Sequence, residues 1–247
     1  MQYYTINRTV FKFMISAVVI SFNDEAYLEA CLKHLTFVHQ IIVIGSLDFE
    51  VEQKLKKQFD FHFIKNEKDD LSLLFEIATP HCQHDWILGI EANMVISTDL
   101  KNEILSKIDP QKKPKIYKAK IQFDFMGKPL KFSGYRRKWT AILWPKNSRN
   151  ISLAQLNSKL KTSYLGFDIF SERTTQIAKR KALKLYTKNI KPNMIDFIWK
   201  PFWILKKECV FKLCLLDGKQ GFVLAYLRAF TQLKIYLFLW LKYRNLE

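Results

Sequence analysis

The 247-residue sequence lacks most of the short motifs that mark a particular chemistry. It has only 7 glycines, and none belongs to a Gly-rich phosphate-binding loop or to the Gly-x-Ser-x-Gly turn of serine hydrolases. Its 4 cysteines show no repeated spacing, so we expect reduced thiols and neither a disulfide framework nor a zinc site. No run reaches the roughly 18 uncharged residues that a transmembrane helix requires.

Negative charge is scarce in the second part of the chain. Residues 1–100 carry 8 Lys or Arg and 14 Asp or Glu, a net charge of −6. Residues 101–247 carry 32 and 9, a net charge of +23. A basic region of this size favours an anionic partner, which can be a phosphate, a nucleic acid or an anionic lipid. The alternative is that these cations form an ordinary solvated surface.

The first hundred residues do contain a regular alternation of strand and helix patterns. Four apolar runs have the character of strands covered on both faces: residues 14–21, 41–44, 61–64 and 86–90. Helical patterns lie between them, at residues 24–35, 49–59 and 70–78. This alternation predicts an α/β fold with a parallel sheet and right-handed crossovers.

The strand predicted at residues 86–90 leads into Glu91-Ala92-Asn93. Open α/β sheets bind their ligands at the carboxyl ends of parallel strands. Side chains two positions apart on such a strand face the same side, so Glu91 and Asn93 can both offer oxygens to a divalent metal, Mg or Mn. We therefore treat these two residues as a candidate metal site.

Beyond residue 94 the pattern changes. We expect a helix at residues 99–108, a half-exposed strand at 116–125, a basic loop at 133–138 before a strand at 139–144, and a very basic helix at 174–188.

The last segment, residues 202–246, is apolar and aromatic with sparse cations. Within residues 222–244, the polar side chains fall in an arc of about 160° on a helical projection. They are Arg228, Thr231, Gln232, Lys234 and Lys242. This pattern predicts an interfacial helix on an anionic membrane surface, and the alternative is a core helix that caps the domain.

Several segments together resemble a known family. They are residues 15–32, 85–88, 127–134, 200–202, and Leu216-Asp217-Gly218 followed by Gly221-Phe222. These segments resemble the family-2, GT-A-type glycosyltransferases, and the last one most resembles the bacterial lipopolysaccharide-core β-glucosyltransferase group. The resemblance covers nearly the whole chain. It implies a GT-A-like (Rossmann-like), mostly parallel sheet over residues 1–193 and a basic, membrane-associating helical segment over residues 194–247.

The resemblance also implies an activity. A hexose would pass from a nucleotide sugar, with inversion at the anomeric carbon, to a lipid-linked glycan such as the lipopolysaccharide core. The enzyme would be cytoplasmic and peripheral on the inner face of the cell membrane. Cofactor-binding roles fall on Asn23, Glu25 and Asp48 near the nucleoside, and on Arg136 and Arg137 at a phosphate of the donor or acceptor.

A general base must come from the few carboxylates of the basic half. Asp168 and Glu172 are the candidates ahead of Asp124, and their spacing of four residues places both on one face of a helix.

The chain departs from the family at several motif positions. The family has Asp-x-Asp where this chain has Glu91-Ala92-Asn93, and Gly45 stands where an Asp usually holds the base of the nucleotide. Leu71-Ser72 replaces a basic residue and an Asn, and the group's histidines near 155–170 are absent. An alternative function is therefore a catalytically impaired binding or scaffold protein at the inner membrane. Nucleic-acid binding is a third interpretation of the charge, but the sequence contains no recognised binding module.

Overall fold

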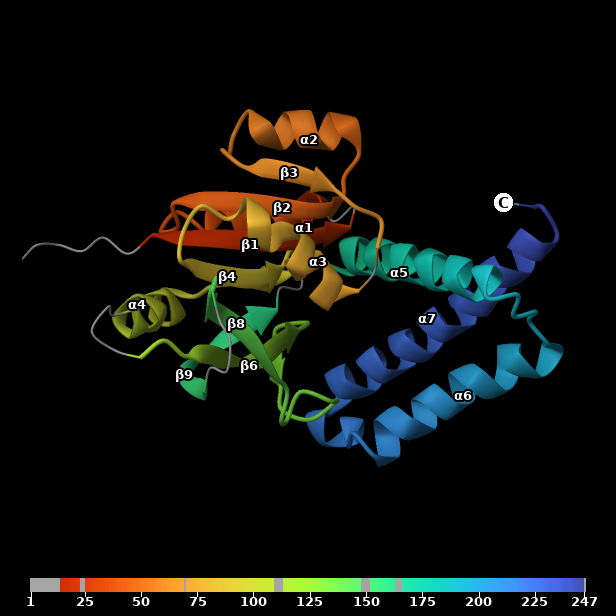
Figure 1. The fold of residues 1–247 in the computed structure, drawn as a ribbon. Helices are drawn as coiled ribbons and strands as arrows, with labels where there is room; N and C mark the ends of the chain where they lie inside the picture. Colours follow the sequence, from red (N-terminus) through yellow and green to blue (C-terminus); the bar gives the residue numbers. More distant parts are fainter. Residues whose placement is uncertain are drawn as a thin grey trace, which may run out of the picture.

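The computed structural model describes residues 14–22, 25–68, 70–108, 113–147, 152–162 and 166–246. These residues form a nine-stranded sheet with helices packed on it and a group of three further helices beside it (Figure 1). The sheet order is β3-β2-β1-β4-β8-β6-β9-β5, with β7 paired to β6. The α/β, Rossmann-like fold class predicted from the sequence is confirmed, with a sheet that is mixed and not mostly parallel.

The first four strands of this order are parallel, as the sequence predicted. They are β1 (Ile15–Phe22), β2 (Gln40–Ser46), β3 (His62–Lys65) and β4 (Trp86–Glu91). The connecting helices are α1 (Glu25–Lys33), α2 (Phe49–Lys56) and α3 (Leu71–Ala78), the last followed by the 3₁₀ turn η1 (Thr79–His81). The central strands are mostly apolar because helices cover both faces, and Ile15 to Ser21 of β1 are all buried, the two serines included.

The second part of the sheet is mixed. It consists of β5 (Met94–Val95), β6 (Ile116–Phe125), β7 (Lys128–Leu130), β8 (Trp139–Pro145) and β9 (Leu153–Thr162), with helix α4 (Thr98–Lys107) beside it. Strand β8 runs antiparallel to both β4 and β6, whereas β9 runs parallel to β6. Strand β6 alternates buried and half-buried residues along its whole length, as its sequence predicted.

Strand β9 was not predicted, and its geometry gives the reason. Its pairing with β6 is interrupted by a bulge, but burial still alternates along the strand. Three of its inward positions carry the small or polar residues Ala154, Ser158 and Thr162, so hydrophobicity does not alternate clearly in the sequence. The backbone N–H groups of Asn157 and Ser158 donate instead to the carboxylate of Glu103 on α4, each at 2.8 Å. This carboxylate therefore ties α4 to the irregular part of β9.

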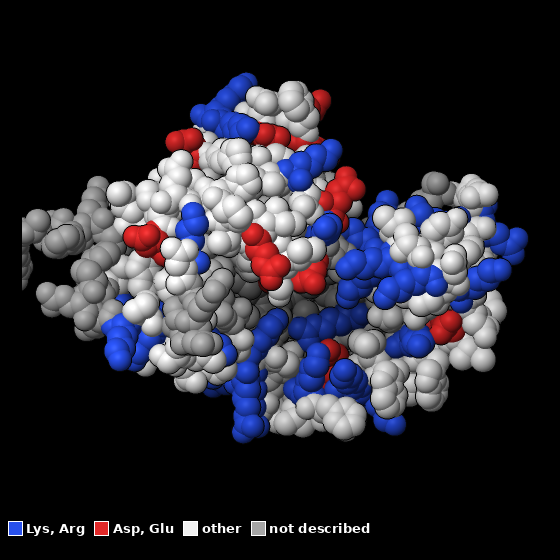
Figure 2. Space-filling model, viewed as in Figure 1, with Lys and Arg blue, Asp and Glu red and all other residues white. Residues whose placement is uncertain are grey.

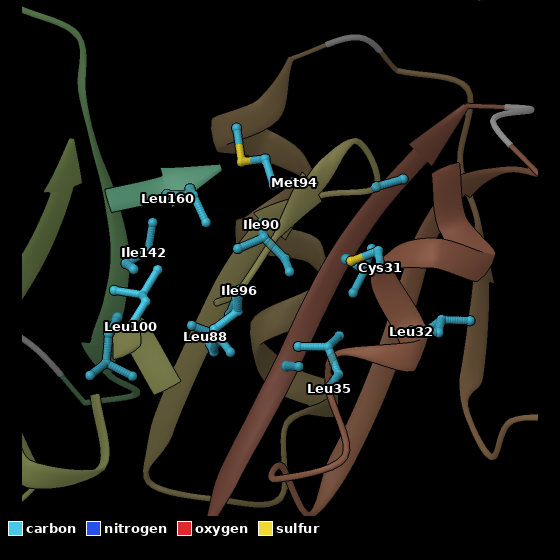
Figure 3. Packing of buried hydrophobic residues seen from close by; sticks show 14 of the residues in the cluster. Cys31, Leu32, Leu35, Leu88, Ile90, Met94, Ile96, Leu100, Ile142 and Leu160 are labelled. Atoms are coloured by element: carbon cyan, nitrogen blue, oxygen red, sulfur yellow. The ribbon is translucent and has the colours of Figure 1, made fainter. Parts of the chain in front are cut away.

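The main core lies between α1 and the sheet. Leu28, Cys31 and Leu32 of α1 are buried in one cluster with Leu88 and Ile90 of β4. Figure 3 shows part of this cluster, in which Cys31 points from α1 toward the strands. Burying one such aliphatic side chain contributes about 1.5–3 kcal/mol, so this layer stabilises the edge of the sheet where the strands end.

The three remaining helices are α5 (Phe167–Thr187), α6 (Met194–Val210) and α7 (Lys219–Tyr243), with the 3₁₀ turn η2 (Cys214–Asp217) before α7. In Figure 1, α7 lies between α5 and α6. Lys and Arg gather over this helical part in Figure 2, whereas most of the visible Asp and Glu lie over the sheet. The predicted boundary at residues 193/194 falls between α5 and α6 and stays a prediction.

Two helix boundaries differ from expectation. Helix α5 begins at Phe167 and not at Thr174, because Gly166 in a positive-φ conformation starts the helix and places Phe170 against Phe125 of β6. Helix α6 begins at Met194 and contains Pro201, whereas the last apolar segment was expected to begin at residue 202.

Helix α7 is long and apolar enough, by length and composition alone, to cross a membrane, and it is the one helix among the described residues for which this holds. A third of its most apolar stretch (33%) is buried inside the protein. Its sequence therefore also suits a helix that packs within a fold.

A buried ion pair fixes the α6–α7 hairpin. The Glu208 carboxylate is 3% exposed and accepts a hydrogen bond from Nη1 of Arg228 at 2.6 Å. The same Arg228 nitrogen donates to the carbonyl of Ser133, in the loop after β7, at 2.8 Å. The hairpin is thereby joined to the sheet.

Asp217 makes a second connection between the same elements. Its buried carboxylate accepts hydrogen bonds from the backbone N–H groups of Lys131 and Phe132 and from the Ser133 hydroxyl, at 2.6–3.1 Å. The Leu216-Asp217-Gly218 segment thus has a structural role, in which one side chain satisfies several donors of a loop far away in sequence.

Candidate active site

The candidate site lies where the parallel strands end. The carboxyl ends of β1, β2 and β4 meet at one edge of the sheet, and α5 lies next to this edge (Figure 1). This is the position at which open α/β sheets bind ligands. Two neighbouring cavities occupy it.

The first cavity has a volume of about 390 Å³ and is lined by residues from three elements. Glu25 comes from α1, Asp48 precedes α2, and Glu172 and Arg173 come from α5. The cavity thus brings together two of the predicted cofactor-binding residues and one predicted catalytic residue. Lys54 pairs with Glu25 at 2.7 Å on its rim.

The other residues predicted near this cavity have different positions. Asn23 lies outside the described residues. Asp168 is exposed in the first turn of α5 and does not line the first cavity. Asp124 of β6 accepts a hydrogen bond from Gln122 at 2.9 Å. Of the candidate bases, Glu172 is the one at the cavity.

Arg173 connects the first cavity to the end of β4. Its Nη2 lies 3.7 Å from Oε2 of Glu91, and its guanidinium lies over the ring of Tyr27 at 5.3 Å from the centroid. The two paired side chains are 20% and 33% exposed, so solvent screens their attraction only in part. The sequence did not predict a role for Arg173, although the basic helix was expected to begin only one residue later, at Thr174.

The residues at the predicted metal position do not fit a divalent cation. Glu91 already faces the Arg173 guanidinium, and Asn93 is 7% exposed with its Oδ1 fully buried and without a hydrogen-bond partner. Among the described residues, no group of three or more His, Cys, Asp or Glu is placed to hold a metal ion. One carboxylate beside a fixed positive charge is a poor donor set for Mg or Mn, which favour several hard oxygen ligands.

The second cavity, of about 340 Å³, is lined by Asn93 and by three cations, Arg173, Lys181 and Arg228. Its remaining walls include aromatic side chains, among them Tyr135. Burial raises the pKa of the Tyr135 hydroxyl, which keeps its proton while its oxygen accepts a hydrogen bond from Nη2 of Arg228. Arg173 lines both cavities, so positive charge is concentrated where they adjoin.

Arg136 and Arg137 are both exposed in the loop after β7 and line neither of these two cavities. Arg136 lines a separate cavity of about 410 Å³ together with Lys120, Lys131 and Lys159. The predicted contact of both arginines with a phosphate stays a prediction, and Arg137 does not line this separate cavity either.

Gly45 explains one departure from the family pattern. It has a φ of 141°, and a Cβ placed there would lie 1.8 Å from the carbonyl oxygen of Ser21 on β1. No side chain fits at this position, so an Asp at the end of β2 is excluded by the backbone itself. Asp48, three residues further on, is the carboxylate that reaches the first cavity.

No protein-family model matches the chain. Similar solved structures include S. aureus TarS 1–349 in complex with UDP-GlcNAc, at 13% identity, a TM-score of 0.47, and coverage of 94% of this chain and 92% of that one. Another is S. aureus TarS, at 12% identity and a TM-score of 0.45 over 87% of this chain and 55% of that one. A third is the bifunctional IspDF from Campylobacter jejuni, at 12% identity and a TM-score of 0.43, over 66% of this chain and 54% of that one. The chain thus spans about half the length of two of these proteins, and likeness at this level says nothing about its activity.

Proposed function

We propose that the protein is a glycosyltransferase that moves a hexose from a nucleotide sugar to a glycan acceptor. The observation that supports this proposal is the meeting of Glu25, Asp48 and Arg173 around one cavity at the carboxyl ends of the parallel strands. Carboxylates accept hydrogen bonds from ribose hydroxyls, and a guanidinium binds phosphate oxygens in a fork geometry. The cavity therefore suits a nucleoside diphosphate.

The proposed reaction is an inverting displacement. The acceptor hydroxyl attacks the anomeric carbon, the bond from that carbon to the diphosphate oxygen breaks, and the nucleoside diphosphate leaves with an added negative charge. Arg173 and Lys181 line the cavities where this charge develops and supply fixed positive charge that offsets it. Glu172 is the proposed general base that takes the proton of the acceptor hydroxyl.

The proposed acceptor is a lipid-linked saccharide, of the lipopolysaccharide core or a related surface glycan. The resemblance to the lipopolysaccharide-core β-glucosyltransferase group supports this choice, as does the excess of Lys and Arg after residue 100. In this proposal the protein lies on the cytoplasmic face of the cell membrane, where anionic lipids attract its basic part.

Titration calorimetry with a panel of nucleotide sugars tests the proposal, with UDP-GlcNAc and UDP-glucose as first probes. We expect one donor to bind, and Asp48→Asn to weaken its binding while the exposed Asp60→Asn leaves it unchanged. The absence of binding by every donor would contradict the proposed function.

The second candidate is a protein that binds a donor or glycan without turnover. The pairing of Glu91 with Arg173 favours this alternative, because it leaves the usual metal position without a free carboxylate. The two candidates are distinguished by adding extracted membrane glycolipids to the protein and its donor. A binding protein would bind the donor without releasing the nucleoside diphosphate, whereas a transferase would release it.

A further inference from the structure

Helix α6 carries large apolar side chains on its outer side. Six of them are 45–76% exposed: Met194, Ile195, Ile198, Trp199, Phe202 and Trp203. Ile195, Ile198, Trp199 and Phe202 follow the spacing i, i+3, i+4, i+7 and therefore form one stripe. Exposed apolar side chains are unremarkable singly, but a continuous stripe of this kind marks an interaction surface.

The opposite side of α6 already has its partners. Phe197 packs with Tyr236 of α7, Ile204 lines the second cavity, and Glu208 is paired with Arg228. In Figure 1, α6 is the outermost of the three helices, with α7 between it and α5. The outer stripe is thus a second apolar face on the same helix.

The stripe continues in sequence through the turn that follows. Val210, Phe211, Leu215 and Leu216 are 55–70% exposed. We define the outer face of α6 as the six exposed residues of the helix together with these four.

The charges around the outer face are positive. Lys200, Lys206, Lys207, Lys212 and Lys219 lie on or next to it in sequence. Of the acids between residues 194 and 246, Asp196 accepts a hydrogen bond at the start of α6, and Glu208 and Asp217 are buried. The exposed charge that accompanies the apolar stripe is therefore almost entirely cationic.

This combination is complementary to an anionic bilayer. Tryptophan and lysine favour the headgroup boundary, where an aromatic ring enters the apolar side and an ammonium group reaches the phosphates. Lys206 illustrates the pairing, with its Nζ 5.8 Å from the ring centroid of Trp203. A protein partner is a poorer match, because lysine is depleted in protein–protein interfaces.

The polar arc of α7 cannot serve the same purpose. Arg228, Thr231 and Gln232 line the second cavity, and Lys234 donates a hydrogen bond to Thr175 of α5 at 2.8 Å. Four of the five side chains that the sequence assigned to lipid headgroups thus face other parts of the protein, and the fifth, Lys242, lies over the ring of Tyr186 on α5. A bilayer would therefore contact a different surface.

We propose that the outer face of α6 is the surface that binds the membrane, with the helix lying in the headgroup region of an anionic bilayer. This inference deepens the membrane part of the proposed function, and it does not depend on the donor or the chemistry.

Vesicle binding tests the proposal directly. We expect the protein to co-sediment with vesicles of phosphatidylglycerol and phosphatidylcholine, and to bind pure phosphatidylcholine far more weakly. The double variant Ile198→Glu/Phe202→Glu should lose at least tenfold in affinity. Phe49→Glu is the matched control, because Phe49 is 74% exposed on α2, away from the helical part, and this variant should bind as the wild type does.

Brominated lipids provide a second readout. They should quench the fluorescence of Trp199 and Trp203. The contribution of these two residues is the difference in quenching between the wild type and the double variant Trp199→Phe/Trp203→Phe. Circular dichroism checks that each variant keeps its fold.

Three results would overturn the inference. The first is that the wild type does not bind the anionic vesicles, and the second is that the double variant binds them as well as the wild type does. The third is that the wild type is a dimer and the double variant a monomer, because a second copy of the chain would then cover the face. Donor binding measured without vesicles separates these results from failure of the proposed function. A protein that binds donor but no vesicles loses only this inference.

Discussion

Nη2 of Arg173 on α5 lies 3.7 Å from the carboxylate of Glu91 at the end of β4, so a cation of the protein itself occupies the neighbourhood in which the family places a metal. The same guanidinium lines both cavities of the candidate site. Unlike the charge of a bound metal ion, the charge of Arg173 does not depend on the concentration of metal in solution. Only a mutation removes it.

The first prediction is that nucleoside diphosphate binding depends on Arg173 and not on a divalent cation. Arg173→Gln should weaken binding about 30-fold or more, since removal of one charged partner costs about 2 kcal/mol or more. Calorimetry in EDTA and in excess Mn²⁺ should give equal affinities for the wild type. Lys179→Gln is the control, because it removes an exposed cation of the same helix that lines neither cavity. Binding that requires Mn²⁺ would contradict this prediction.

The second prediction separates the two candidate bases. Glu172→Gln should lower kcat by roughly 10²–10⁴, the usual contribution of a general base, with little change in donor affinity. Asp168→Asn should leave kcat unchanged, because this exposed carboxylate does not line the first cavity. Steady-state rates of nucleoside diphosphate release measure both variants, and equal losses in the two would show that neither is the base.

The third prediction concerns the stability of the hairpin. Glu208→Gln should lower the free energy of unfolding by about 3–5 kcal/mol, because Arg228 keeps its charge in a partly buried site without its partner. Lys212→Ala removes the more exposed partner of Glu208 and should cost at most about 1 kcal/mol. Urea unfolding followed by circular dichroism distinguishes the two, and similar losses would argue against a special role for Arg228.

The fourth prediction is a dependence of stability on pH. Burial alone would raise the pKa of Glu103, but the N–H groups of Asn157 and Ser158 outweigh it and lower the pKa below its usual range. A carboxyl with a lowered pKa in the folded state contributes stability above its unfolded pKa of about 4.3 and loses it as the pH falls through the folded value. The midpoint of thermal unfolding should therefore fall more steeply below about pH 4.5 in the wild type than in Glu103→Gln. Parallel pH profiles would show that Glu103 does not contribute in this way.

The sequence predicts the first half of the fold well, for a physical reason. Strands β1, β2 and β4 are buried on both faces, and the resulting apolar runs are visible without knowledge of any partner strand. Strand β9 is held by its pairing with β6 and by Glu103, contacts that depend on distant residues. Its inward positions include Ala154, Ser158 and Thr162, whose small or polar side chains hide the alternation in the sequence.

The candidate site was predicted in part. Glu25 and Asp48 line the first cavity because each stands near the start of a helix that the pattern located correctly. Glu172 lines it too, but it lies in the part of α5 that precedes the predicted start of that helix. Arg173 was missed because the register of α5 depends on Gly166 and on the packing of Phe170, which the basic composition of the helix does not show. The exposed apolar face of α6 was hidden for a similar reason, since only the structure shows which apolar face is already covered.

Asp217 and Arg228 have a mechanical consequence. Both hold the loop that follows β7, and this loop also carries Tyr135 of the second cavity. The hairpin cannot swing on the sheet unless several buried donors lose their acceptor together, so the two parts move as one rigid body. Any surface that binds α6 therefore also fixes the orientation of the two cavities relative to it. It also fixes the distance between that surface and the cavities, at which an acceptor can enter.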